Sequence, residues 1–463
     1  MRFKDFAKEL KLSRQITIKV RWLLVFWLFV LSAVAFLDRV NISIAGSIIS
    51  SEYHLDKVEL GWVFSAFLLG YALFQTMGGR LADRFGSRRV LAAGVVWWGV
   101  FTALTAAVPS GITMALALFI AARFLLGAGE AVVYPASNQF VARWIPMSER
   151  GIANGWIFAG VGAGAGLTPP IITYIMLHYG WRASFWFCAI VGAVAGTVWY
   201  IAARDTPEQH PFVPQEERQA IRYGTETVSH VPGLGDRRIP TASVALVPWS
   251  SVLRSKEVLA ITVSYFCYGY VAWIFFSWFY IYLAEVRGLN LKTSGVLAML
   301  PFLAMAVTCP VGGFLNDWVT ARRGPRVGRC GLAAFAMTLT AVFLAVGSGA
   351  ASAQVASLVL AGGAGTLYLS QSSFWSVSAD IAGASSGSVS GFMNMGAQIG
   401  GAITASLTPW IAQRLGWTAS FLVAAGISAL GAAAWLLVDP TATLSQTAKD
   451  MERPPLQTQT VAR

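Results

Sequence analysis

The chain has 463 residues, of which 56% are hydrophobic and only 12% are charged. Soluble domains carry about 25% charged residues, so this composition excludes a water-soluble protein of this size. The formal net charge is +12. In a soluble protein such a charge would favour nucleic-acid binding, but here the placement of the basic residues indicates a membrane topology instead.

Apolar stretches follow one another along the chain, and each is close to the ~20 residues that a helix needs to cross a bilayer. We expect twelve of them, at residues 22–46, 58–79, 90–108, 112–138, 151–176, 183–203, 258–284, 293–316, 330–348, 353–377, 386–411 and 416–438. The first is too long, and too closely followed by the second, for a cleavable signal peptide. The pattern predicts an all-α membrane protein with twelve transmembrane helices in two six-helix bundles.

Polar segments divide this array. Residues 1–203 and 258–440 form the two predicted bundles, 204–257 is a cytoplasmic linker, and 441–463 is a disordered cytoplasmic tail. With the N-terminus in the cytoplasm, 27 of the 34 Lys and Arg residues fall in cytoplasmic segments and five in the opposite loops. This bias places both termini in the cytoplasm. The compact loops are typical of a bacterial inner-membrane protein, which we expect to be a monomer that binds no nucleic acid.

The two halves contain matching landmarks. Gly79-Arg-Leu-Ala-Asp83 ends the second stretch, and Gly313-Phe-Leu-Asn-Asp317 ends the eighth, 234 residues later. The fifth and eleventh stretches each contain a pair of glycines four residues apart, which is typical of close helix packing. A six-helix unit duplicated in parallel is one architecture of secondary transporters, with the substrate site near mid-membrane between the halves.

Four ionisable residues, Asp38, Arg39, Arg123 and Glu130, lie inside apolar stretches. A charge at the bilayer centre costs roughly 2.5–3.5 kcal/mol, so such residues face a cavity or one another. Arginine stays charged when buried and its planar fork matches a carboxylate, whereas a carboxyl group can bind and release a proton. A purely structural ion-pair network is the alternative. The four cysteines and four histidines form no cluster with metal-ligand spacing, so we expect no metal and no cofactor.

The stretch from Gly79 to Arg89 resembles the major facilitator superfamily, whose loop between the second and third helices reads Gly-x-x-x-Asp-Arg-x-Gly-x-Arg-Arg. Its matching residues here form a predicted cytoplasmic gate motif: Gly79, Asp83, Arg84, Gly86, Arg88 and Arg89. We expect Asp83 to cap the positive N-terminus of a helix in the opposite half. The second copy has Trp318 where the first has Arg84.

Two further segments, 36–45 and 129–136, resemble the anion:cation symporter family, which includes galactonate, glucarate and hexuronate transporters. The resemblance implies that Asp38 and Glu130 are proton sites, that Arg39 binds the substrate carboxylate, and that Arg123 orients the acids. Neutral polar and aromatic residues suit the rest of a sugar acid. As further substrate-binding candidates we name Asn41, Tyr71, Gln75, Trp273, Gln371, Ser373, Trp375 and Asn394.

The resulting hypothesis is a proton-coupled symporter that imports a small organic anion by alternating access. The leading candidate for the substrate is a sugar acid such as an aldonate, aldarate or hexuronate. Carriers of aromatic or dicarboxylic acids remain an alternative. Export of cationic drugs is disfavoured, because two buried arginines would repel them. A membrane-bound enzyme or sensor would need a catalytic constellation or a signalling domain, and the sequence has neither.

Overall fold

The computed structural model describes residues 19–55, 57–231, 235–240, 246–279, 282–283 and 291–444. The predicted tail beyond residue 444 lies outside the described residues. The helices of the first half are α2 (Val20–Tyr53), α3 (Lys57–Phe85), α4 (Ser87–Ala107), α5 (Ala115–Glu130), α6 (Val133–Trp144), η1 (Met147–Glu149), α7 (Arg150–Tyr179) and α8 (Trp181–Ala202). Those of the second half are α11 (Lys256–Ser277), α13 (Leu291–Arg323), η5 (Arg326–Gly331), α14 (Leu332–Ser348), α15 (Ala353–Leu369), α16 (Gln371–Ala382), η6 (Gly383–Ser385), α17 (Ser386–Leu415), α18 (Trp417–Ala434) and η7 (Trp435–Leu437).

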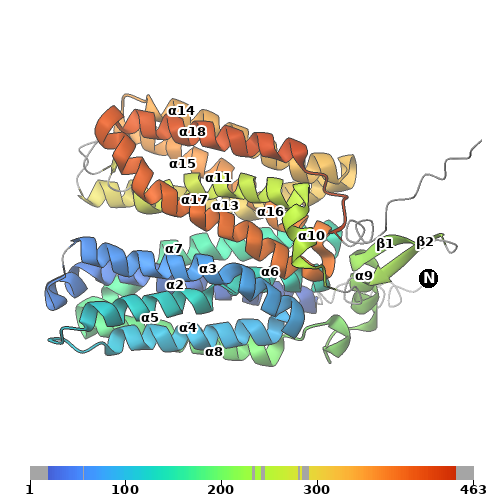
Figure 1. Cartoon of the computed structure of the whole chain (residues 1–463), viewed down its shortest axis with the longest axis horizontal. Coiled ribbons are helices and arrows are strands. Elements are labelled where there is room, and N and C mark those ends of the chain that lie inside the picture. Colours follow the sequence, from blue (N-terminus) through green and yellow to red (C-terminus); the bar gives the residue numbers. More distant parts are fainter. Residues whose placement is uncertain are drawn as a thin grey trace, which may run out of the picture.

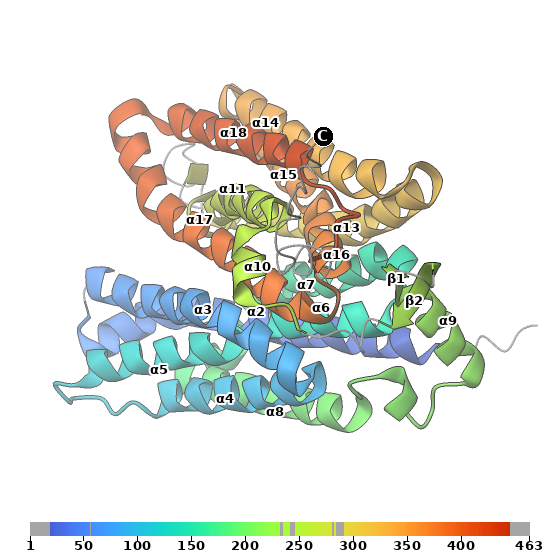
Figure 2. The ribbon, with the colours of Figure 1, turned by 45° about the vertical axis from the view of Figure 1, so that its right-hand side comes forward.

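Helices α2 to α8 gather on one side of the molecule and α11 to α18 on the other (Figure 1). A rotated view shows the same two sets of helices, which meet where α16 lies beside α6 and α7 (Figure 2). Helix is the expected conformation for these apolar segments, because a helix satisfies its backbone hydrogen bonds internally. Eleven stretches of the described residues are long and apolar enough to cross a membrane. The chain is therefore a multi-pass membrane protein.

Ten of the twelve predicted spans coincide with one such stretch each. The other two, 353–377 and 386–411, fall together within the single stretch Ala353–Leu415. The predicted fourth span, 112–138, corresponds to the stretch Ala115–Trp144, which continues further than expected. It is divided into two helices, because α5 ends at Glu130 and α6 begins at Val133.

Glycines allow the two halves to approach closely. On α7, a side chain at Gly151 or Gly155 would collide with the backbone of α13. On α17, a side chain at Gly387 or Gly391 would collide with the backbone of α3. The glycine pairs that matched in the sequence lie on other faces of α7 and α17, where they pack against α2 and α11 of their own halves.

The linker begins with η2 (Pro207–Gln209) and α9 (Gln215–Thr225), and ends with α10 (Trp249–Arg254). Between these lies a two-stranded antiparallel hairpin of β1 (Glu226–Val231) and β2 (Gly235–Pro240). This hairpin is a departure from the all-helical prediction, although the membrane part is helical. The carboxylate of Glu217 on α9 accepts hydrogen bonds from the backbone of Val20 and Arg21 at 3.1 and 3.2 Å, so the linker contacts the start of α2.

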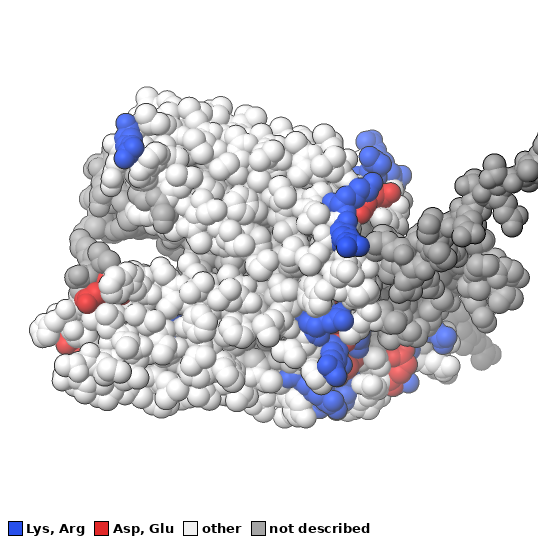
Figure 3. Space-filling view, viewed as in Figure 1, with Lys and Arg blue, Asp and Glu red and all other residues white. Residues whose placement is uncertain are grey.

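Exposed Lys and Arg residues gather at one end of the molecule (Figure 3). This end carries the last turns of α3 and α13 and the first turn of α4, with Arg84, Arg322 and Arg323 among its residues. We call it the basic end.

Candidate substrate and coupling site

The centre of the candidate site is an ion pair between α2 and α5. The Nε of Arg39 donates to Oε1 of Glu130 at 2.5 Å. Glu130 is the last residue of α5, at the interruption before α6. The two residues between α5 and α6 keep helical backbone angles, and the Ala131 N–H still donates to the Gly127 carbonyl at 3.0 Å, so the interruption is a local distortion within one span.

Aromatic rings surround the Arg39 guanidinium. Its Cζ lies 4.3 Å from the ring centre of Tyr71, 4.6 Å from Phe36 and 5.4 Å from Phe67. The side chain of Arg39 retains 11% of its exposure, whereas Glu130 retains none. Arg39 is therefore the accessible member of the pair. Rings on a cation also limit its hydration, which strengthens its attraction to an anion.

Asp38 faces a different neighbour from Arg39, because successive residues of a helix point about 100° apart. Its Oδ2 accepts a hydrogen bond from Thr102 of α4 at 2.5 Å, and its strongest electrostatic attraction is to Arg123 of α5. Arg123 also attracts Glu130 and lies 4.9 Å from the ring centre of Phe67. One direct ion pair therefore forms, between Arg39 and Glu130, while Arg123 acts on Asp38 by electrostatic attraction alone.

Several buried polar atoms at this place have no hydrogen-bond partner among the described residues. They are Asp38 Oδ1, Arg39 Nη2, Arg123 Nε and Nη1, Glu130 Oε2, the Tyr71 hydroxyl and both amide atoms of Gln75. Buried polar groups in proteins are nearly always hydrogen-bonded, so such a concentration indicates a place for water or a polar ligand.

The second half contributes a neutral cluster. The hydroxyl of Tyr265 on α11 accepts hydrogen bonds from Gln371 Nε2 at 2.8 Å and from Trp375 Nε1 at 3.1 Å. The Trp375 ring also lies 5.9 Å from that of Tyr134 on α6, across the boundary between the halves. Like the fourth span, the tenth is interrupted, at Ser370 between α15 and α16. Tyr265 and Thr102 were not among the sequence candidates, because a lone tyrosine or threonine in a helix gives no distinguishing signal.

Two of the other candidates, Asn41 and Ser373, form hydrogen bonds with neighbouring helices, and two more are placed by packing and burial alone. The amide of Asn41 bonds Ser184 at 2.8 Å and contacts the Cys188 thiol of α8. Ser373 accepts a hydrogen bond from Asn316 of α13 at 2.7 Å. Trp273 packs on Gly401 and on the ring of Phe276. The Phe276 ring in turn contacts Phe36, which lies beside Arg39. Asn394 is buried on α17.

At the basic end, Asp83 joins α3 to α17 of the opposite half. Its Oδ1 accepts from the backbone N–H of Gly387 at 2.9 Å, and its Oδ2 from the backbone N–H of Ser388 at 2.7 Å. The Ser388 hydroxyl also donates to Oδ2, at 2.5 Å. Because α17 begins at Ser386, these are free donors of its first turn, and the carboxylate is favoured there by the helix dipole. The expected contact is therefore present.

The second copy of the motif makes the same contact in reverse. Asp317 of α13 accepts from the backbone N–H groups of Gly151 and Ile152 at 2.9 and 2.7 Å, in the first turn of α7. We call these two contacts the paired caps. Trp318, which replaces Arg84 in this copy, carries the guanidinium of Arg322 at 4.0 Å from its ring centre.

A buried ion network lies beside the paired caps. Asp380 of α16 accepts from Arg150 of α7 at 2.6 Å and lies 2.7 Å from Nε of Arg329 on η5. Asn316 receives Arg329 Nη1 at 2.7 Å and donates to Ser373. Asp380, Arg329 and Asn316 were not among the residues predicted from the sequence, because a single polar residue near a span end is not distinctive.

The remaining residues of the gate motif have separate surroundings. Gly79 crosses Gly387 so closely that a side chain would overlap the Gly387 carbonyl. Gly86 has a φ of 87°, which favours glycine, at the turn between α3 and α4. Arg88 donates to the Tyr200 carbonyl at 2.8 Å, while Arg84 and Arg89 are exposed.

Comparison with known proteins supports the same class. The family model described as Major Facilitator Superfamily matches residues 28–405 and 376–463. The chain belongs to the Major Facilitator Superfamily. A curated relative from Cupriavidus necator is named probable sulfoacetate transporter. It is 32% identical to this chain, over 92% of this chain and 96% of its own length. A hexuronate transporter from Bacillus subtilis is 27% identical over 87% of this chain and 91% of its own.

A solved structure of the same superfamily has a similar fold. The proton:xylose symporter XylE, bound to 6-bromo-6-deoxy-D-glucose, superposes with a TM-score of 0.70 at 14% identity, covering 93% of this chain and 99% of that one. The relatives are transporters of this superfamily, so the chain is a transporter and not an enzyme.

Proposed function

We propose that this transporter is a symporter that imports a small organic anion together with protons by alternating access, and that the anion is a sugar acid. The observation that carries the proposal is the Arg39–Glu130 pair: a partly accessible, permanently charged guanidinium held by a fully buried carboxylate. An anionic substrate and Glu130 compete for the same cation.

The proposed cycle follows from that competition. With both acids ionised, Glu130 holds Arg39 and Asp38 attracts Arg123. Protons entering from outside neutralise the acids and release Arg39. The substrate carboxylate then binds the freed fork of Arg39, since a bidentate pair with a carboxylate is favourable in a dry site. The neutralised site crosses to the inward-facing state, and both ligands leave on the cytoplasmic side.

The neutral surroundings suit a polyhydroxylated acid. Gln75 offers both donors and acceptors that have no partner in the described part of the chain, and Tyr71 adds a hydroxyl beside Arg39. We assign these two residues to the substrate from the first half, and Gln371, Trp375 and Asn394 from the second. Transport of hexuronate by the Bacillus subtilis relative supports this substrate class.

A small sulfonated carboxylate is the second candidate. The relative from Cupriavidus necator is named for sulfoacetate, which carries two acidic groups. Arg39 and Arg123 both have guanidinium nitrogens without partners in the described residues, so two anionic groups could each find a donor.

We further propose twelve spans in two bundles, 1–203 and 258–440. Within Ala353–Leu415, α15 with α16 would make one crossing and α17 the return. The basic end then faces the cytoplasm of a bacterial inner membrane, with both termini on that side and the protein working as a monomer. The paired caps would close this end while the site is open to the outside.

Uptake into proteoliposomes tests the function. The panel contains radiolabelled hexuronates, aldonates, aldarates, sulfoacetate and aromatic acids, each measured with and without an inward proton gradient. Gradient-driven accumulation of a sugar acid supports the proposal, and accumulation of sulfoacetate alone selects the second candidate. If no carboxylate moves under either condition, the role assigned to Arg39 is wrong.

A further inference from the structure

A groove of about 770 Å³ lies on the outer surface of the first half, between α4 and α8. The middle of the groove is lined by small residues, which are Ala92 and Ala93 on α4 and Gly196 on α8. A side chain at Gly196 would collide with Val95, so the two helices are in close contact beneath the groove. The groove is therefore a consequence of small residues on two tightly packed helices.

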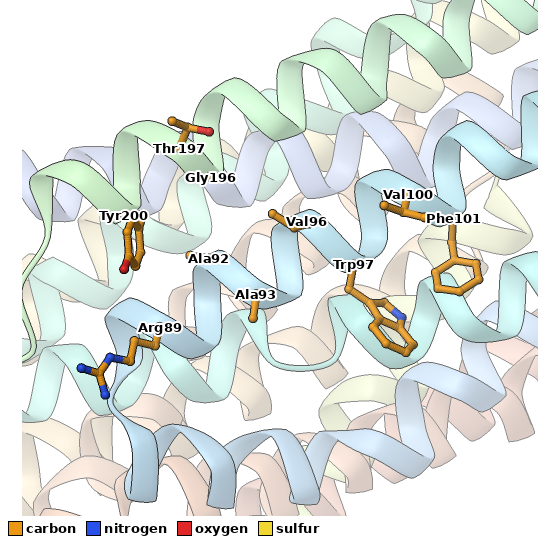
Figure 4. A pocket seen from close by; sticks show the side chains of 10 residues that line it. All are labelled: Arg89, Ala92, Ala93, Val96, Trp97, Val100, Phe101, Gly196, Thr197 and Tyr200. Carbon is orange, nitrogen blue, oxygen red and sulfur yellow. The ribbon is translucent and has the colours of Figure 1, made fainter.

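The two ends of the groove differ in character. Arg89 and Tyr200 lie at one end, whereas Trp97, Val100 and Phe101 line the other (Figure 4). The Trp97 indole is fixed in place, since its Nε1 donates to the Leu125 carbonyl of α5 at 2.7 Å. The groove is thus apolar along most of its length. Its one basic residue, Arg89, lies where the groove reaches the basic end of the molecule.

Arg89 is an unused cation. It is exposed, and it forms no hydrogen bond or ion pair with any other residue that the structure describes. Its neighbour Arg88 is engaged, with Nε on the Tyr200 carbonyl at 2.8 Å and Cζ 4.3 Å from the Tyr200 ring centre. The nearby carboxylate of Asp205 accepts the backbone N–H of Arg88 at 2.9 Å and attracts Arg143, so it is occupied as well.

The length of the groove matches one leaflet. From Arg89 to Val100 is eleven residues of helix, or about 17 Å at about 1.5 Å per residue. Half of a hydrocarbon core of about 30 Å is about 15 Å. An acyl chain that starts at the headgroup level beside Arg89 therefore ends near the bilayer midplane, where Val100 and Phe101 lie.

We propose that this groove binds an anionic glycerophospholipid, with its phosphate on Arg89 and one acyl chain along Ala93, Val96 and Val100. Charge complementarity selects this occupant, because an apolar partner helix would leave Arg89 without an anion. A zwitterionic lipid would fill the groove equally well but would bind Arg89 less strongly, because its headgroup carries its own cation.

Native mass spectrometry of the delipidated full-length protein tests this, with phosphatidylglycerol and phosphatidylcholine of identical acyl chains as probes. We expect the first phosphatidylglycerol to bind about fivefold more tightly than phosphatidylcholine, the gain expected for one basic residue near the lipid phosphate. Arg89→Gln should remove this preference, and Ala93→Leu should weaken both lipids by obstructing the groove.

Two variants serve as matched controls. Arg323 is the exposed arginine 234 residues later, in the second copy of the motif, and Ala433 is an exposed alanine of α18. Arg323→Gln and Ala433→Leu should bind both lipids as the unmodified protein does. Equal losses in Arg89→Gln and Arg323→Gln would show general attraction by surface charge and overturn the proposal. So would unchanged lipid binding by an Ala93→Leu protein that elutes as a folded monomer.

Discussion

The carboxylates of Asp83 and Asp317 cap the first turns of helices in opposite halves, α17 and α7, through pairs of backbone N–H groups at 2.7–2.9 Å. Asp83 lies on α3, which packs against α17, and Asp317 lies on α13, which packs against α7. The two contacts are therefore related by the internal repeat. Because both cross the boundary between the halves at the basic end, the proposed opening of that end would have to break both contacts. The paired caps therefore stabilise the state seen here.

Asp83→Asn should shift the conformational equilibrium towards opening of the basic end. A carboxylate at a helix N-terminus contributes roughly 1–2 kcal/mol when partly buried, which is about a five- to thirtyfold change in the equilibrium. Spin labels on exposed Ile112 and Arg414, at the opposite end, report the change as a shorter distance distribution. The native cysteines are buried, so labelling at introduced cysteines is selective.

The matched control is Asp439→Asn, which removes the same charge from a partly exposed carboxylate whose side-chain hydrogen bonds, within the described part of the chain, go to Thr441. That protein should give the unmodified distance distribution. If Asp83→Asn also leaves the distribution unchanged, the cap at Asp83 does not hold the basic end closed.

Gly79→Ala should act in the same direction by a steric route. The added methyl group would overlap the Gly387 carbonyl, a backbone atom that can move only if α17 moves. The same labels should report opening of the basic end, and transport should slow because one state becomes disfavoured. Gly426→Ala is the control, because a side chain at Gly426 meets no atom within 4 Å. Equal behaviour of the two proteins would exclude a role for the Gly79 crossing.

Much of this arrangement could be predicted from the sequence. Charges in apolar stretches are costly enough that Asp38, Arg39, Arg123 and Glu130 were expected to face a cavity or one another, and Arg39 does contact Glu130. The direction of Asp38 and Arg39, about 100° apart on one helix, also follows from the helical repeat. The fixed spacing of Gly79 and Asp83 indicated a helix cap across the halves, and that contact is present.

Other features depend on tertiary packing that the sequence does not reveal. Asn41 and Ser373 have polar side chains that could bind a substrate, yet both form hydrogen bonds with residues of neighbouring helices. The network around Asp380 joins residues 230 apart in the chain, and no local pattern signals it. The interruption of the fourth span after Glu130 was also not predicted, since the apolar pattern continues through it.

Arg39→Lys should weaken substrate binding while preserving the charge of the site. Lysine lacks the planar fork that matches a carboxylate, and it would not stack on Tyr71 and Phe36 in the same way. We expect at least about a tenfold rise in KM for uptake, equivalent to about 1.4 kcal/mol. Arg182→Lys is the control, because Arg182 pairs with Glu52 at 2.8 Å in a half-exposed position outside the site. A normal KM for Arg39→Lys would indicate that Arg39 does not contact the substrate.

Glu130→Gln tests whether Glu130 couples protons to substrate through Arg39, as proposed above. Glutamine keeps the size and a hydrogen bond to Arg39 but cannot release a proton. In proteoliposomes with an inward proton gradient, the variant should fail to accumulate the substrate identified in the uptake panel, while still exchanging labelled for unlabelled substrate across the membrane. Accumulation at the unmodified level would contradict the account, because Glu130 would then not be the coupling site.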